Sequence, residues 1–473
     1  MYSVSMPMNQ GVSVTQTSTP LYLLGPLEPA RAETDTRELD VIGALPPELS
    51  GMYVRNGPNA HPGEDPGHAW AGHGMVHGIR VEAGRATWYR SRWVDTTPAP
   101  AGYDFFAPGR DRSVTAANTS IVPYAGRLLA LQEAGLPYEV DRELNTVGVF
   151  DFDGRLTTGM TAHPKFDARA GELHFFDSYL PEQPHLVHHV ASAEGELLRS
   201  TAIELPEVPL MHDFALTEHY VIFYDLPVVA DPAIANAMPF RWSDDHEPRI
   251  GVMPRNGVGA DTIWITVDPC WVIHTANARE DSQGRIVVEG NRVVPDRWDI
   301  SWARLGGSLD HVPGNLDTRN PLPEAHLHRW TLDLGTRTVR EEALDDRAIE
   351  FPTIDLARAG LSHEHVYAVG YPRVGGADGY ELIKYDTSTG TDQVRSFGTN
   401  QIPGEAYFVA APDASADDEG WLFTLVSGVD GGASELMVLD ASDFTGHPVA
   451  RIVLPERIPY GFHGSWVPDQ VRH

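Results

Sequence analysis

The sequence predicts an all-β protein, and among all-β architectures it favours a β-propeller. Short apolar runs rich in β-branched and aromatic residues recur along the chain, and each is bounded by glycine, aspartate, proline or asparagine. Glycine (44 residues) and proline (37) are spread throughout the 473 residues, whereas few stretches place apolar residues at helical spacing. So many strands in one chain are typical of a propeller or of a pair of β-sandwiches.

The expected strands follow one another along the chain. They are RLLALQEA (127–134), GELHFFDSY (171–179), HYVIFYDL (219–226), TIWITVD (262–268), HVYAVGYP (365–372), YELIKYD (380–386), GWLFTLVSG (420–428) and SELMVLDA (434–441). In TVGVFDFDGRLTTGM (146–160), Asp153 and Gly154 are the turn residues of an expected β-hairpin. We expect a short helix at DLARAGL (355–361).

Fragments in which an aspartate and a small turn separate two strands favour the propeller. Examples are FDFDGRL (150–156), KYDTSTGT (384–391) and VLDASDFTG (438–446). Such fragments recur roughly every 50 residues, a repeat length typical of propeller blades, although no WD or kelch motif is present. We expect the polar residues 1–20 to be disordered and residues 21–473 to form a single domain.

Composition excludes several classes of function. The net charge of −31 and the pI of about 4.9 disfavour binding to nucleic acids or anionic membranes. Cys270 is the only cysteine, which excludes an intramolecular disulfide and a cysteine-based zinc cluster. No apolar run is long enough to span a bilayer, and the N-terminal residues lack the basic and apolar regions of a signal peptide. We therefore expect a cytoplasmic protein.

The 21 histidines are the richest source of chemistry in the chain. His163, His212, His274 and His463 each lie at the edge of an apolar strand or at a strand–turn junction, separated by 49, 62 and 189 residues. The first two intervals approximate one blade each, so side chains from the inner strands could converge on the propeller axis. Four neutral imidazoles there would suit a borderline divalent metal such as Fe(II), Cu or Zn. Acids that accept the free N–H groups of the ligands would then be expected nearby.

Spacing alone leaves other histidine sets open. The pairs His326/His328 and His363/His365 are at i, i+2 on expected strands, so each pair points to one face and could chelate a metal. Further candidates are His188, His189 and the group His61, His68, His73 and His77.

Several longer motifs decide between these sets, because together they resemble the carotenoid cleavage oxygenase family. They include GMYVRNGPNAHP (51–62), GHGMVHGIRV (72–81), LLALQEAGLPYEV (128–140), TAHPKFDARAGELHFF (161–176), MHDFALTEHYVIFYDLPVV (211–229), IHTANARE (273–280), EFPTID (350–355), PGEAYFV (403–409) and GFHGSW (461–466). The resemblance implies a seven-bladed β-propeller with loops and short helices capping one face, over an axial Fe(II) site with one ion per chain. The implied ligands are His163, His212, His274 and His463. The implied hydrogen-bond partners of these ligands are Glu133, Glu350 and Glu405.

By the same resemblance, the chain is expected to be a non-haem dioxygenase. It would use O2 to cleave a C=C double bond of a carotenoid or apocarotenoid into two carbonyl products, with no residue needed as a general acid or base. The alternative is a stilbenoid or phenylpropenoid substrate; Gln132 argues against it, because the stilbene branch of the family typically has a lysine there. A metal-dependent isomerase or hydrolase and a non-enzymatic scaffold are the other hypotheses.

The resemblance also implies an apolar substrate, a tunnel and an oligomeric state of monomer or homodimer. The expected tunnel aromatics are Phe105, Phe106, Tyr138, Phe176, Tyr179, Trp264 and Phe408, with packing inside the blades as the alternative for each. The amphiphilic segment 228–240 is a candidate for peripheral membrane contact during substrate uptake.

Overall fold

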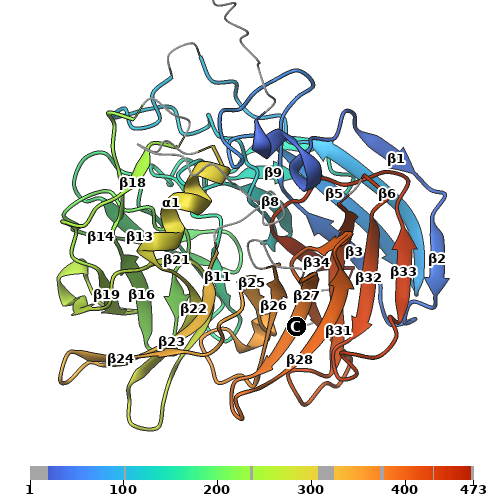
Figure 1. The fold of residues 1–473 in the computed structure, drawn as a ribbon. Coiled ribbons are helices and arrows are strands. Elements are labelled where there is room, and N and C mark those ends of the chain that lie inside the picture. Colours follow the sequence, from blue (N-terminus) through green and yellow to red (C-terminus); the bar gives the residue numbers. More distant parts are fainter. Residues whose placement is uncertain are drawn as a thin grey trace, which may run out of the picture.

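Seven antiparallel sheets of four to six strands follow one another around a common axis, which makes the molecule a seven-bladed β-propeller (Figure 1). The computed structural model describes residues 20–100, 103–234, 238–306, 324–372, 378–429 and 431–469. Residues 1–19 of the segment expected to be disordered lie outside these described residues.

The first four blades use the N-terminal half of the chain and one C-terminal strand. Blade I contains β1 (Thr34–Thr36), β3 (Gly51–Arg55), β4 (Pro58–Asn59), β5 (His73–Glu82), β6 (Arg85–Trp93) and β34 (Gly464–Pro468). Blade II contains β7 (Ser120–Tyr124), β8 (Arg127–Leu131), β9 (Tyr138–Val140) and β10 (Thr146–Val149). Blade III contains β11 (Lys165–Asp167), β12 (Glu172–Asp177), β13 (Leu186–Ser192) and β14 (Leu197–Ile203). Blade IV contains β15 (Ala215–Leu216), β16 (Tyr220–Asp225), β19 (Arg249–Pro254) and β20 (Ile263–Thr266).

The last three blades complete the ring. Blade V contains β21 (Trp271–Glu280), β22 (Ile286–Val293), β23 (His326–Asp333) and β24 (Thr338–Ala343). Blade VI contains β25 (Ile349–Thr353), β26 (His365–Gly370), β27 (Tyr380–Asp386) and β28 (Thr391–Gly398). Blade VII contains β2 (Asp40–Gly43), β29 (Gln401–Pro403), β30 (Tyr407–Ala410), β31 (Gly420–Gly428), β32 (Glu435–Asp440) and β33 (Ala450–Val453).

Both ends of the chain close the ring. The C-terminal strand β34 pairs with β3, with Tyr53 opposite Trp466, and the N-terminal strand β2 pairs with β33, with Val41 opposite Ile452. Hydrophobic clusters fill the interfaces between neighbouring blades, including the one between blades VII and I around Tyr53 and Phe423. The core therefore lies between the blades and continues across the closure.

One strand of each blade lines the axis. A cavity of about 170 Å3, here called the axial channel, is lined by residues of β7, β11, β15, β21, β25, β30 and β34. Side chains at the ends of these seven strands can therefore meet, although the strands are far apart in the sequence.

A cap covers one end of the axis. It includes helix α1 (Pro295–Arg304) and the ribbon formed by β17 (Val228–Ala230) and β18 (Phe240–Trp242), which lie in the upper part of Figure 1. Trp298 and Trp302 of α1 pack against Trp271 of β21 and Trp70 of the β4–β5 loop, with ring centroids 5.0 and 5.5 Å apart. Burial of these large rings attaches the cap to the propeller.

The sequence-based expectations for the elements are largely confirmed. All eight expected strands are present, as β8, β12, β16, β20, β26, β27, β31 and β32. The expected hairpin at 146–160 is wrong, because β10 pairs with the preceding strand β9. Phe152 and Asp153 adopt positive φ angles, and the chain turns towards the axis, where Met160 bridges Gly135.

Among the described residues, three 3-10 helices of a single turn are present in addition to the helix expected at 355–361. They are η1 (Leu21–Leu23), η2 (Gly25–Leu27) and η3 (Gly259–Asp261), and the expected helix is itself only one turn, η4 (Leu356–Arg358). Helix α1 was not expected from the sequence. Within the described ranges, none of the helices combines the length and the apolar character that crossing a bilayer requires.

Candidate metal centre

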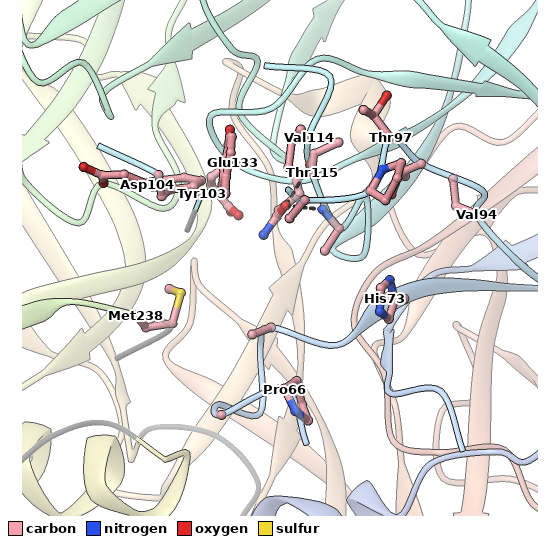
Figure 2. Close-up of a pocket in the computed structure, with 18 of the residues that line it drawn as sticks. Pro66, His73, Val94, Thr97, Tyr103, Asp104, Val114, Thr115, Glu133 and Met238 are labelled. Carbon is pink, nitrogen blue, oxygen red and sulfur yellow. Dashed lines mark hydrogen bonds between the residues drawn. The ribbon is translucent and has the colours of Figure 1, made fainter. Parts of the chain in front are cut away.

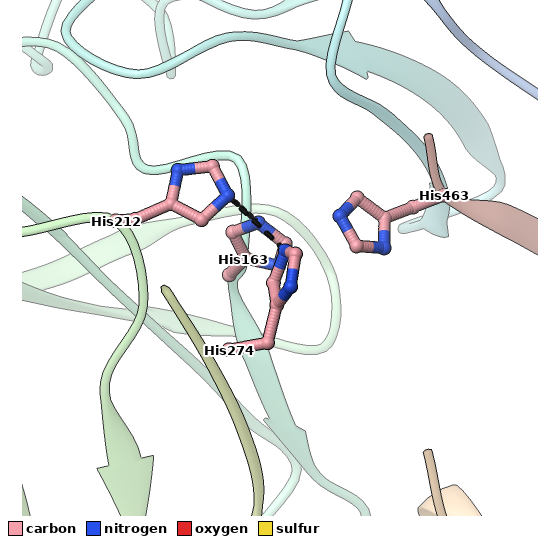
Figure 3. A group of neighbouring side chains, drawn as sticks. All are labelled: His163, His212, His274 and His463. Atoms are coloured by element: carbon pink, nitrogen blue, oxygen red, sulfur yellow. Dashed lines mark hydrogen bonds between the residues drawn. The ribbon is translucent and has the colours of Figure 1, made fainter. Parts of the chain in front are cut away.

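Four histidines from four blades meet at the cap end of the axis. His163, His212 and His463 lie just before the inner strands β11, β15 and β34, and His274 lies within β21. Their rings face one another, with centroids 4.5 Å apart for His163 and His212 and 4.8 Å apart for His274 and His463 (Figure 3). We call this set of His163, His212, His274 and His463 the histidine cluster. One nitrogen from each ring lies within 4.8 Å of the others, a spacing that a single ion could bridge.

Some ring nitrogens of the cluster lie within hydrogen-bond distance of one another. Nε2 of His212 lies 3.0 Å from Nε2 of His163 and 3.2 Å from Nε2 of His274. At such distances one nitrogen must donate a proton to the other, or a cation must lie between them.

Three carboxylates occupy the outward nitrogens of three of these rings. Nδ1 of His212 lies 2.6 Å from Glu133, Nδ1 of His274 lies 2.5 Å from Glu350, and Nδ1 of His463 lies 2.8 Å from Glu405. Two of the carboxylates are themselves fixed by the backbone: Phe351 N–H donates to Glu350, and Gly464 N–H donates to Glu405. The structure thus brings together all seven residues that the sequence analysis selected.

This arrangement fits a divalent cation. An imidazole that donates its Nδ1–H to a carboxylate keeps a lone pair on Nε2, so neutral rings would point lone pairs at one another across 3 Å-scale gaps. A metal ion that accepts these lone pairs removes the repulsion, and the outward carboxylates fix each ring and raise its basicity. Four nitrogen donors without a thiolate suit borderline metals such as Fe(II), Cu or Zn.

Without a cation, the pKa values of the clustered histidines shift in opposite directions. Burial lowers the pKa of His163 and of His274 well below the usual value, and the neighbouring imidazoles lower it further. Burial also opposes charge on His212, but the adjacent Glu133 carboxylate raises the pKa of His212 above its ordinary value. Burial raises the pKa of Glu350 to about 7. His163 and His274 are therefore held as neutral imidazoles, the form that ligates metals.

Two connected cavities lead from the cap side to the cluster. The outer chamber, of about 1370 Å3, is lined by residues 93–99 and 103–106 and by cap residues such as Met238 (Figure 2). The inner chamber, of about 40 Å3, touches His212, His274 and His463. Residues lining both chambers form what we call the passage: Gln132, Glu133, Tyr179 and Met238. A large ligand in the outer chamber can therefore extend a narrow part to the cluster.

The alternative histidine sets lie elsewhere and have their own partners. Nδ1 of His326 contacts the Arg347 carbonyl, and His328 and His363 lie beside Glu341 and Glu289. His189 contacts Thr158 and Ser200, His188 contacts His174, and His77 contacts Tyr89. His61, His68 and His73 lie outside the cluster, near the outer chamber or the cap tryptophans.

A second grouping of metal-ligand type contains Glu364, His365 and Asp417. Asp417 already accepts hydrogen bonds from the ring of His365 and from the backbone N–H groups of Glu364 and His365. These bonds explain the grouping as a structural tie between blades VI and VII.

The expected aromatic lining of the substrate tunnel is confirmed only in part. Phe105, Phe106 and Tyr179 line the outer chamber. The remaining expected aromatics pack inside or between blades: Tyr138, Phe176, Trp264 and Phe408. Phe462 precedes β34 and lines the inner chamber, whereas Trp466 lies within β34 and packs against Phe423 at the blade I–VII interface.

Several other lining residues were not predicted from the sequence. Trp70, Thr115 and Met238 belong to loops with no regular period, so nothing in the local pattern marks them.

Comparisons with known proteins agree with this geometry. The family model described as retinal pigment epithelial membrane protein matches residues 27–468. A carotenoid cleavage oxygenase of Mycobacterium tuberculosis is 36% identical, over 94% of this chain and 97% of its own length.

Solved structures of related proteins show the same fold. A variant of the Synechocystis apocarotenoid oxygenase has a TM-score of 0.79 at 27% identity, over 95% of this chain and 98% of its own. The lignostilbene dioxygenase of Pseudomonas brassicacearum has a TM-score of 0.79 at 28% identity, over 98% of this chain and 100% of its own.

Proposed function

Because the chain belongs to the carotenoid cleavage oxygenase family, and is thus an oxygen-incorporating oxidoreductase, we propose that it cleaves a C=C double bond of a carotenoid or apocarotenoid. The products would be two carbonyl compounds, and the cofactor one Fe(II) per chain bound by the histidine cluster, with O2 as co-substrate. The observation that carries the proposal is the convergence of four imidazoles, three of them backed by carboxylates, at the inner end of a large cavity.

The residues around the ion would contribute by orienting its ligands, offsetting its charge and excluding water. When bound, Fe(II) supplies the activation of O2 for attack on an electron-rich double bond. Glu133, Glu350 and Glu405 orient the ligand rings and offset the charge of the ion. The inner chamber excludes water through apolar side chains that include Leu210, Ile273 and Phe351. No general acid or base is assigned.

The shape of the route supports an extended, apolar substrate. The narrow inner chamber accommodates a slender double bond beside the cluster, while the outer chamber has room for a long arm and an end group. Gln132 borders the passage, and its Oε1 accepts hydrogen bonds from Thr115 and from the Ala116 N–H. An amide in this place cannot stabilise a phenolate with a full charge, which favours the isoprenoid substrate over a phenol.

A stilbenoid or phenylpropenoid substrate is the second candidate. The similarity to lignostilbene dioxygenase favours it, because this solved structure fits the chain as well as the apocarotenoid oxygenase does.

A product assay separates the candidates. Fe(II)-loaded protein receives an apocarotenal and a hydroxystilbene together in air, and products are identified by mass spectrometry. We expect shortened polyene aldehydes, with oxygen from 18O2 in the products. Aromatic aldehydes alone would establish the stilbenoid alternative. Products without label would instead indicate an isomerase or hydrolase that uses the metal as a Lewis acid.

We further propose that residues 21–473 act as one domain in a cytoplasmic monomer or homodimer that contacts membranes only peripherally. The segment 228–240 contains the β17–β18 ribbon, and its Phe240 faces the outer chamber, which places it beside the substrate entrance. Size-exclusion chromatography with light scattering and flotation with neutral vesicles test the oligomeric state and the membrane contact.

A further inference from the structure

The passage is lined by a tyrosine hydroxyl that has no hydrogen-bond partner among the described residues. Tyr179 is 4% exposed and lines both chambers. Its ring is held edge-on by Phe105 and Phe240, with centroids 6.1 and 5.8 Å away, and its backbone N–H donates to Asp177. Across the described part of the chain, no group accepts from or donates to the phenolic oxygen. A molecule inside the passage that carries an oxygen acceptor can therefore form a hydrogen bond with this hydroxyl.

Tyr179 remains a neutral donor. Burial raises the pKa of Tyr179 well above its ordinary value, and the charges of Glu133 and Asp177 raise it further. The phenol therefore offers its proton to a carbonyl or hydroxyl oxygen across the working range of pH.

The outer chamber has a strongly one-sided charge. Its charged lining residues in the described structure are all acids, apart from the titratable His61 and His73: Glu33, Asp65, Asp95, Asp104 and Glu133. Two arginines contact this wall from behind. Arg92 lies 3.8 Å from Glu33, and Arg110 lies over the ring of Phe105 and donates to the Tyr103 hydroxyl.

This charge works against anionic ligands. Apart from Glu133, which lies against His212, four carboxylates of the wall exceed two guanidinium groups, and the whole protein carries a net charge of −31. A carboxylate that enters the chamber loses hydration and meets like charge, whereas an aldehyde or alcohol of the same shape does not.

We propose that the route to the histidine cluster selects uncharged, oxygen-bearing substrates. Tyr179 donates a hydrogen bond to the substrate oxygen in the passage, and the acidic outer chamber rejects the corresponding carboxylate. The inference rests on the proposed function for the polyene skeleton and adds the chemical class of its polar group.

The test uses four ligands that share one polyene skeleton and end in an aldehyde, an alcohol, a carboxylate or a methyl group. Binding to the Fe(II)-loaded full chain is followed without oxygen by quenching of tryptophan fluorescence, since Trp70 and Trp93 line the chambers. We expect the carboxylate to bind at least about tenfold more weakly than the alcohol, and the difference to shrink at high salt. Equal affinity of the carboxylate and the alcohol at low salt would overturn the electrostatic selection.

Two substitutions test the residues. Tyr179→Phe should weaken binding of the aldehyde and alcohol by about three- to tenfold and leave the methyl-ended ligand unchanged. Asp95→Asn, which removes one exposed charge of the chamber, should improve binding of the carboxylate. Tyr124→Phe is the matched control, because Tyr124 is 5% exposed and its hydroxyl already donates to the Ser192 carbonyl. Equal loss for all four ligands in Tyr179→Phe would show a structural role and contradict the proposal.

The same ligands in air separate this inference from the proposed function. If the selectivity is found but no ligand is cleaved, the proposed function fails and the binding preference stands. If ligands are cleaved without selectivity, the inference fails and the proposed function stands.

Discussion

Glu350 and its ring partner His274 show how single residues define the candidate metal centre. The carboxylate is fully buried, lies 2.5 Å from Nδ1 of His274 and also accepts the Phe351 N–H. A buried acid with these contacts fixes both the rotation of the ring and the nitrogen that carries the proton. Its role is therefore to present the Nε2 lone pair to the axis.

Glu350→Gln should weaken metal binding by about 10- to 100-fold while the fold persists. The amide keeps the shape of the side chain but loses the charge that strengthens His274 as a ligand. Titration of the metal-free protein with Co(II), followed by visible absorption, measures the affinity. Glu82→Gln, at an exposed position in β5, is the control, and an equal loss in both variants would contradict the assigned role.

For single residues, the sequence predicted which residues form the candidate site better than it predicted which glutamate contacts which histidine. The four histidines and three glutamates were identifiable from short motifs because each keeps a distinctive local context. Their pairing was not derivable, since Glu350 and Glu405 lie 76 and 58 residues from their partners and meet them only through the ring of blades. The free hydroxyl of Tyr179 could not be predicted either, because the lack of a hydrogen-bond partner depends on the tertiary neighbours of the side chain.

Among the elements, the segment that leads into β34 is tightly packed near the candidate metal centre. Arg55 of β3 is buried and donates to the Pro459 carbonyl, and Gly461 lies directly on its guanidinium group. A Cβ atom at position 461 would lie 2.4 Å from Nη1 of Arg55. The glycine is required here for close approach, and the segment it belongs to presents His463.

Gly461→Ala should therefore lower the free energy of unfolding by about 1–3 kcal/mol, as expected for overpacking at a buried site. It should also weaken metal binding, because the strain is relieved by moving the neighbouring His463. Thermal unfolding with and without Co(II) measures both effects. Gly335→Ala is the control, since its Cβ would meet only Asp333 Oδ1, at 3.4 Å; unchanged metal affinity in Gly461→Ala would contradict the coupling.

Blade V contains a buried charge network that makes stability depend on pH. Glu289 of β22 is fully buried, with Arg279 of β21, Arg329 of β23 and His363 at 3.2, 2.7 and 2.8 Å. Burial alone would raise the pKa of Glu289, but the contact with His363 and the two guanidinium groups lower it to about 2.

The sign of the effect follows from the unfolded value of about 4.3. A depressed pKa stabilises the fold at pH values above the unfolded value, and this stabilisation disappears as pH falls towards 2, by up to about 3 kcal/mol. Glu289→Gln should destabilise the protein at pH 7, and its difference from the parent should shrink between pH 5 and 2. Urea unfolding across this range measures the difference, and a constant difference would refute the assignment. Glu342→Gln on β24 is the control.

In the whole molecule, ring closure brings the two ends of the chain together. Local sequence patterns predicted individual strands but not this long-range pairing. The alternation and turn residues predicted strands such as β12, β16 and β31, because each is specified by its own residues. The hairpin at 146–160 failed because tertiary contacts, including the Met160–Gly135 bridge, override the local turn preference. The places of β2 and β34 are set by pairing across more than 400 residues, which no local window contains.

The charge of the whole molecule leads to a final prediction. A net charge of −31 makes the compact state repel itself, and the repulsion acts between exposed groups at long range. Added salt shortens the Debye length from about 30 Å at 0.01 M to about 8 Å at 0.15 M, so it should relieve most of this repulsion. It should affect buried contacts such as the Glu289 network far less.

We therefore expect the melting temperature to rise by several degrees between 0.01 and about 0.3 M NaCl and then to level off, because screening saturates. KCl should act equally, whereas an uncharged osmolyte at matched osmolality should not reproduce the steep initial rise. Differential scanning calorimetry of the metal-free protein at constant pH measures the curve. A flat or falling curve would mean that the surface ion pairs, such as Arg80 with Asp469, outweigh the net repulsion.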